Sequence, residues 1–109
     1  MIFIAKTSDL KDGELKKFKY KGRDAVLVRA GGEFHAFIDY CTHAGGPLTM
    51  ENCKLKCLTH YALFNPKTGK AESLPAPENS YLMEIKLEVK DDKVYHLNRI
   101  VFKSKKNNL

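Results

Sequence analysis

The sequence lacks any apolar run long enough to cross a membrane or to form the hydrophobic region of a signal peptide. The first apolar run covers only residues 1–5. We therefore expect a soluble protein without a membrane partner, located in the cytoplasm. The length of 109 residues predicts one domain, spanning residues 1–109.

Cysteine and arginine are scarce. The three cysteines form an odd number, which argues against a disulfide framework. Cys53 is interpreted as a free thiol in a loop that borders a metal site formed by the other two. Only three of the 19 basic residues are Arg, whereas surfaces that bind nucleic acid usually combine Arg and exposed aromatics with Lys. The net charge of +6 therefore indicates a solvated basic surface or a docking surface for an acidic protein, and not nucleic-acid binding.

Catalytic arrangements are also missing. The Ser, Tyr and carboxylate residues show no pairing of a nucleophile with a base. The sequence has no site with two histidines and one carboxylate of the kind that an oxygenase needs for iron. His35 and His96 fall in predicted strands and are interpreted as ordinary strand residues. We therefore expect no complete enzyme.

Helical periodicity is absent, and short strand signals separated by turns replace it. Gly31-Gly32 and the segment 90–92 predict hairpin turns, because their residues tolerate positive φ. We predict strands at residues 2–5, 15–20, 25–30, 33–38, 61–64, 82–89 and 93–98, with 70–73 returning beside 61–64 and 99–102 extending the last strand. This pattern is typical of a small all-β antiparallel sandwich or barrel. Residues 41–60 show little alternation, so we expect a separate subdomain at about residues 40–64. The proline loop at 74–78 either covers this subdomain or merely connects strands.

Two short clips contain the residue types that bind metals. Cys41-Thr42-His43 and Cys57-Leu58-Thr59-His60 each supply one thiolate and one imidazole, with 13 residues between His43 and Cys57. This mixture of ligands suits a tetrahedral zinc ion or a [2Fe–2S] cluster in which two histidines replace two cysteines on one iron. Structural zinc sites usually pair like residues within a clip, so mixed clips favour the cluster, with zinc as the alternative.

The residues around the clips resemble the Rieske [2Fe–2S] family. The resemblance rests on the pattern Cys-X-His-X-Gly-X-X-Leu from Cys41, the Cys-X-X-His from Cys57, the Thr68-Gly69 turn and the proline segment at 74–77. It implies an antiparallel β-sandwich with a small cluster-binding subdomain at one tip. It also implies that Cys41 and Cys57 bind one iron and that His43 and His60 bind the other.

The sequence departs from this family at several positions. Many relatives have Pro after each ligand cysteine and Gly after the second histidine, where this chain has Thr42, Leu58 and Tyr61. High-potential relatives carry an interloop disulfide, and also a Ser and a Tyr that donate hydrogen bonds to sulfur. Here Ala62 and Phe64 occupy the latter two places. The departures imply a low-potential ferredoxin.

The resemblance implies a one-electron carrier that serves an oxygenase or a reductase, with redox proteins as partners. Two alternatives stay open at this point. The chain is a small Rieske subunit of a multi-subunit reductase, or it is a zinc-stabilised interaction module without a redox role.

Overall fold

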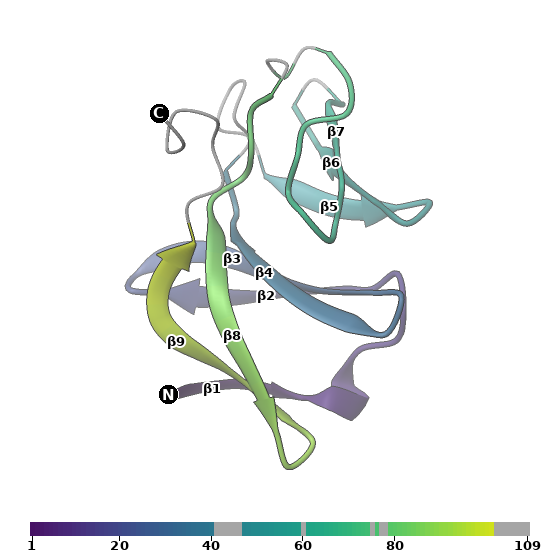
Figure 1. The fold of residues 1–109 in the computed structure, drawn as a ribbon. Coiled ribbons are helices and arrows are strands. Elements are labelled where there is room, and N and C mark those ends of the chain that lie inside the picture. The colour runs from purple at the N-terminus through teal and green to yellow at the C-terminus, as the bar shows by residue number, and fades with distance from the viewer. Residues whose placement is uncertain (41–46, 60, 75, 77–78, 102–109) are drawn as a thin grey trace.

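The computed structural model describes residues 1–40, 47–59, 61–74, 76 and 79–101 (Figure 1). These residues form nine β-strands and one short 3₁₀ helix, η1 (Thr7–Asp9). The strands are β1 (Ile2–Lys6), β2 (Leu15–Tyr20), β3 (Arg23–Ala30), β4 (Glu33–Ile38), β5 (Leu48–Glu51), β6 (Lys54–Cys57), β7 (Leu63–Phe64), β8 (Glu84–Lys90) and β9 (Lys93–Val101). No helix within these ranges has the length and hydrophobicity needed to span a bilayer. The predicted all-β antiparallel class is confirmed.

Six of the strands form one antiparallel sheet in the order β1-β9-β8-β4-β3-β2. Turns at residues 31–32 and 91–92 join β3 to β4 and β8 to β9, and all four turn residues have positive φ. This conformation matches the right-handed twist of the strands that it connects. Both predicted hairpins are confirmed, and β9 continues to Val101 as expected.

Strand β3 is apolar on both faces because it lies between two hydrophobic clusters. Ala25 and Leu27 belong to a cluster formed by side chains of all six strands of this sheet. Val26 and Val28 point to the opposite face, since successive side chains alternate across a strand. They pack in a second cluster with side chains of β4 to β7. All four side chains are fully buried, so β3 joins the two parts of the core.

The six-stranded sheet curls around the first cluster. Its β2 edge approaches β9, where the rings of Phe18 and Tyr20 contact His96 at centroid distances of 6.3 and 5.0 Å. His96 is 4% exposed, so the contact closes the interior of the sheet. This curled sheet forms the larger part of the sandwich.

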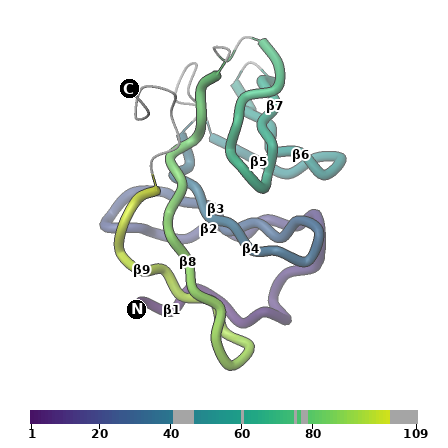
Figure 2. Tube along the Cα trace, in the orientation of Figure 1, coloured from purple at the N-terminus to yellow at the C-terminus, as the bar shows by residue number. Residues whose placement is uncertain are grey.

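A three-stranded sheet, β5-β6-β7, is inserted between β4 and β8, which are neighbours in the large sheet. Figure 2 shows the small sheet beside the large one, with the coloured segment that leads into β8 running from the small sheet to the large one. The β5–β6 hairpin corrects the expectation that residues 41–60 lack strand alternation. Its turn residues, Asn52 and Cys53, have left-handed φ values of 51° and 62°.

Two other predicted segments differ from the structure. The strand expected at 61–64 is limited to Leu63–Phe64, because Tyr61 has a left-handed φ of 65°. The segment expected to pair with it, 70–73, forms a bridge from Lys70 to Tyr81 and one bridge to β7, between Phe64 and Ala71. The turn between them is fixed by Asn65, whose side-chain Oδ1 accepts hydrogen bonds from the backbone N–H groups of Lys67 and Thr68.

Candidate metal centre

Of the four predicted ligands, Cys57 lies among the described residues. It is the last residue of β6 and its side chain is fully buried. Its neighbours in the core include Leu55 and Phe64. The other three predicted ligands, Cys41, His43 and His60, lie outside the described residues.

The second clip begins with a tight turn at the end of β6. The Cys57 N–H donates to the Ala62 C=O at 2.8 Å, and the Tyr61 N–H donates to the Cys57 C=O at 2.9 Å. Closing this turn requires the left-handed conformation of Tyr61, which L-residues with a side chain adopt at a cost. Many members of the family that the sequence resembles have glycine at this position. The positive φ explains why glycine suits it.

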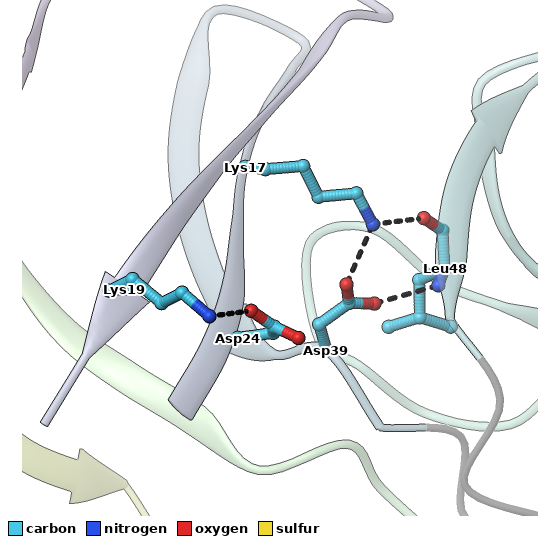
Figure 3. Close-up of polar contacts among 5 residues, drawn as sticks. All are labelled: Lys17, Lys19, Asp24, Asp39 and Leu48. Carbon is cyan, nitrogen blue, oxygen red and sulfur yellow. Dashed lines mark hydrogen bonds and ion pairs between the residues drawn. The ribbon is translucent and has the colours of Figure 1, made fainter. Parts of the chain in front are cut away.

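The first clip lies between β4 and β5. Asp39 follows β4, and its N–H donates to the Asp24 C=O at 2.9 Å. At the other end of the loop, the Leu48 N–H donates to Asp39 Oδ1 at 2.7 Å. Lys17 of β2 donates to both Asp39 and the Leu48 C=O (Figure 3). Asp39 and Lys17 carry no motif in the sequence, and only the three-dimensional structure brings them to this loop.

The ends of the two clips lie side by side. Leu48 pairs with Cys57 in the β5–β6 register, and the Leu58 N–H donates to the Pro47 C=O at 2.8 Å. The chain therefore leaves the first clip and enters the second at the same end of one hairpin. A thiolate and an imidazole from each loop suit zinc or an iron–sulfur cluster bound between the loops, and the buried thiol of Cys57 fits such a site.

The side chains after the second clip differ in exposure. Ala62 and Phe64 are fully buried, and neither has a hydroxyl that could donate a hydrogen bond to sulfur. Tyr61 is 63% exposed, and the Lys56 Nζ lies 4.9 Å from its ring centroid. Lys56 also forms an ion pair with Glu51. Tyr61, which follows the predicted ligand His60 in the sequence, therefore presents its ring at the surface.

Cys53 is an exposed free thiol, as predicted. It occupies the turn of the β5–β6 hairpin, where Glu51 pairs with Lys54. Cys57 lies at the other end of this hairpin. At about 3.4 Å of rise per residue, the two cysteines are separated by the length of strand β6, roughly 13 Å. Cys53 therefore lies at the far end of β6 from Cys57, and the expectation that its loop borders the metal site stays a prediction.

The two remaining histidines belong to the large sheet, as predicted. His35 in β4 lies with its Nε2 3.0 Å from Glu33 Oε1 and its Nδ1 3.6 Å from Glu84 Oε2, and these carboxylates, Glu84 most, raise its pKa. Burial lowers the pKa of His96. Among the described residues, no group of three or more His, Cys, Asp or Glu side chains could hold a metal.

The family model of the Rieske [2Fe–2S] domain matches residues 1–98 of this chain. The ferredoxin component of biphenyl 2,3-dioxygenase from Rhodococcus jostii (strain RHA1) is 38% identical over 92 residues, which cover 81% of this chain and 85% of that protein. Apoptosis-inducing factor 3 from Homo sapiens is 30% identical over 95 residues. That match covers 84% of this chain but only 15% of the human protein.

One similar solved structure is a complex of reduced oxygenase and oxidized ferredoxin in carbazole 1,9a-dioxygenase. The matched chain aligns with a TM-score of 0.82 and 25% sequence identity, covering 94% of this chain and 96% of that chain.

Proposed function

This chain belongs to the Rieske [2Fe–2S] family, since the family model matches residues 1–98, and from this premise we propose that it is a ferredoxin that delivers single electrons to an oxygenase. The observation that carries the proposal is the similarity to the ferredoxin component of biphenyl 2,3-dioxygenase, which extends over 81% of this chain and 85% of the relative. A likeness that covers most of both chains favours the role of a separate electron carrier.

We propose Cys41, His43, Cys57 and His60 as the ligands of the cluster. The adjacent ends of the two clips and the buried Cys57 support this assignment. When bound, the [2Fe–2S] cluster accepts and releases one electron. The chain's own residues supply the two loops, the apolar surroundings of Cys57 and the surface through which a partner approaches.

The cluster-binding subdomain is proposed to span about residues 40–64, with the loop at 74–78 as its cover. The three-stranded sheet lies within this range. Ala76 belongs to the same buried cluster as Cys57, Ala62 and Phe64, which supports the assignment of the loop to the subdomain.

A low reduction potential follows from the residues after the second clip. Hydrogen bonds to sulfur stabilise the additional electron and raise the potential. Since Ala62 and Phe64 are buried without hydroxyl groups, we expect a potential near the lower end of the Rieske range, about −150 mV rather than about +300 mV.

The docking surface is proposed to surround the clips. Tyr40, Leu58 and Tyr61 each adjoin a predicted ligand in the sequence, and they are 57, 50 and 63% exposed. Aromatic residues are enriched at protein interfaces. The net charge of +6 favours partners with acidic surfaces, namely a reductase that donates electrons and an oxygenase that accepts them.

A cytoplasmic location is proposed because Cys53 is an exposed free thiol, and such thiols persist in reducing compartments.

The cluster is tested by the iron and sulfide content of the purified protein, its visible absorption and the electron paramagnetic resonance of its reduced form. We expect two irons and two sulfides per chain and a spectrum with a low average g-value, as a cluster with two imidazole ligands requires. A colourless protein with one zinc per chain would overturn the proposal.

The ligand assignment is tested by replacing histidines. We expect His60→Leu to abolish the visible spectrum, because one iron loses an imidazole ligand. His35→Leu is the matched control, since His35 lies in the large sheet, and it should keep the spectrum. An unchanged spectrum in His60→Leu would refute the assignment of His60.

A second candidate function is a permanently bound redox domain of a larger oxidoreductase. The match to 15% of the human relative favours it, since that relative contains the same kind of domain within a much longer chain. The native mass of the protein isolated from its source distinguishes the two. A free carrier elutes at the mass of the chain, whereas a bound subunit elutes with its complex.

A further inference from the structure

The loop that contains Cys41 and His43 has its two ends joined by hydrogen bonds. Asp39 immediately follows β4, and Leu48 begins β5. The Leu48 N–H donates to Asp39 Oδ1 at 2.7 Å (Figure 3). The two ends of the loop at 40–47 are therefore held next to each other at the end of β4.

Lys17 reaches this point from β2, in another part of the large sheet. Its Nζ donates to Asp39 Oδ2 at 2.7 Å and to the Leu48 C=O at 2.8 Å. The Asp39 side chain is 7% exposed, whereas that of Lys17 is 52% exposed. A carboxylate this buried is costly unless a charge and hydrogen bonds compensate it. Lys17 supplies the compensating charge and at the same time contacts both ends of the loop.

We propose that Lys17 and Asp39 are positioning residues for the first clip. They hold the ends of the loop at a fixed separation, and Lys17 neutralises the Asp39 carboxylate two residues from Cys41. This inference rests on the proposed function, because it assigns the held loop to the cluster.

A second ion pair on the same strand provides a matched control. Lys19, two residues after Lys17 in β2, pairs with Asp24, its register partner in β3 (Figure 3). Both side chains are well exposed, at 69 and 67%. Within the described part of this loop, at residues 40, 47 and 48, neither side chain of this pair forms a hydrogen bond or ion pair, and the contact of Asp24 with Asp39 uses its backbone C=O, which Lys19→Met leaves in place. Lys19→Met therefore removes the same chemical group from the same strand without disturbing the loop.

The first test measures cluster retention in Lys17→Met, Asp39→Asn and Lys19→Met. We expect the rate of cluster loss to a chelator to rise about 10–100-fold in the first two variants, as is usual for residues that support metal ligands. Lys19→Met should stay within about twofold of the wild type, because exposed ion pairs contribute little. Lys17→Arg, which retains the charge, should restore most of the retention.

The reduction potential separates positioning from a general loss of stability. Removing the positive charge of Lys17 should lower the potential, because an unbalanced Asp39 carboxylate repels the incoming electron. Asp39→Asn should raise it, since Lys17 then remains without its partner. A purely structural role for the pair predicts no such opposite shifts.

The second test requires no cluster. In the metal-free protein, hydrogen exchange at the Leu48 amide should be about tenfold faster or more in Lys17→Met than in the wild type, while exchange at the core residue Leu27 is unchanged. The inference would be overturned if the wild type binds the cluster and Lys17→Met matches Lys19→Met in cluster loss, reduction potential and exchange at Leu48. A wild type without a cluster would instead overturn the proposed function, and exchange at Leu48 alone would decide whether the pair holds the loop.

Discussion

At the scale of single residues, one glycine in the turn that follows β7 is required by packing as well as by backbone conformation. Gly69 has a φ of +77°, and a Cβ added there would lie 2.8 Å from Cε1 of Phe37. Phe37 is fully buried in the cluster between the sheets, so its ring has little room to move. Gly22 has a similar φ of +80°, but nothing lies within 4 Å of an added Cβ. Alanine would therefore introduce similar backbone strain at the two positions, but only at Gly69 would it also meet a neighbouring side chain.

Gly69→Ala should lower the free energy of unfolding by about 2–5 kcal/mol, the sum of left-handed strain and overpacking. Gly22→Ala should lower it by about 1–2 kcal/mol, from strain alone. Chemical denaturation of both variants measures the difference. Equal losses would show that Phe37 yields without cost and would contradict the packing interpretation.

At the scale of elements, the long hairpins could be predicted from the sequence and the short one could not. Strands β3 and β4 have six or more residues and a Gly-Gly turn, which together specify register. Strands β5 and β6 have four residues each, too few for alternation to be distinctive. Their turn also places Cys53 in a left-handed conformation, which favours Gly, Asn and Asp over cysteine.

Part of the candidate site could be predicted from the sequence, and part could not. The types and spacing of Cys41, His43, Cys57 and His60 are local features of the sequence. Lys17 and Asp39 are 22 residues apart, and they meet only because β2 and the end of β4 converge in the folded sheet. No local pattern could have predicted this pair.

The turn of the short hairpin yields a prediction about Cys53. Cys53→Gly should raise the free energy of unfolding by about 0.5–1 kcal/mol, because relief of left-handed strain exceeds the added entropy of the unfolded chain. The visible spectrum should not change, since Cys57 lies at the opposite end of β6. Cys53→Ala, which removes the thiol and keeps the strain, is the control in chemical denaturation. A bleached spectrum in Cys53→Gly would contradict the expectation that this end of the hairpin does not affect the cluster.

At the scale of the whole molecule, two histidines give the fold opposite dependences on pH. The Glu84 and Glu33 carboxylates raise the pKa of His35 above its ordinary value of 6.5. Its contribution to stability is therefore complete below about pH 6.5 and is lost as the pH rises through the raised value. Burial lowers the pKa of His96, so its contribution is instead lost as the pH falls below 6.5.

Comparison of the wild type with His35→Gln isolates the first contribution, because His96 is present in both proteins. The urea concentration at the unfolding midpoint should be higher for the wild type than for the variant. This difference should be largest at about pH 6 and should shrink by about pH 9. Urea denaturation at several pH values provides the measurement. A difference that grows with rising pH would contradict the assigned interaction between His35 and Glu84.

The small sheet begins and ends at neighbouring points of the large one. The Ile38 N–H at the end of β4 donates to the Met83 C=O, just before β8, at 2.9 Å. Everything between these residues is an excursion from two strands that already lie side by side. The part of the chain proposed to bind the metal can therefore change in length while the strand order of the large sheet is preserved. The large sheet can therefore stay the same while the proposed cluster-binding subdomain changes, so the surface offered to redox partners can vary without a change of fold.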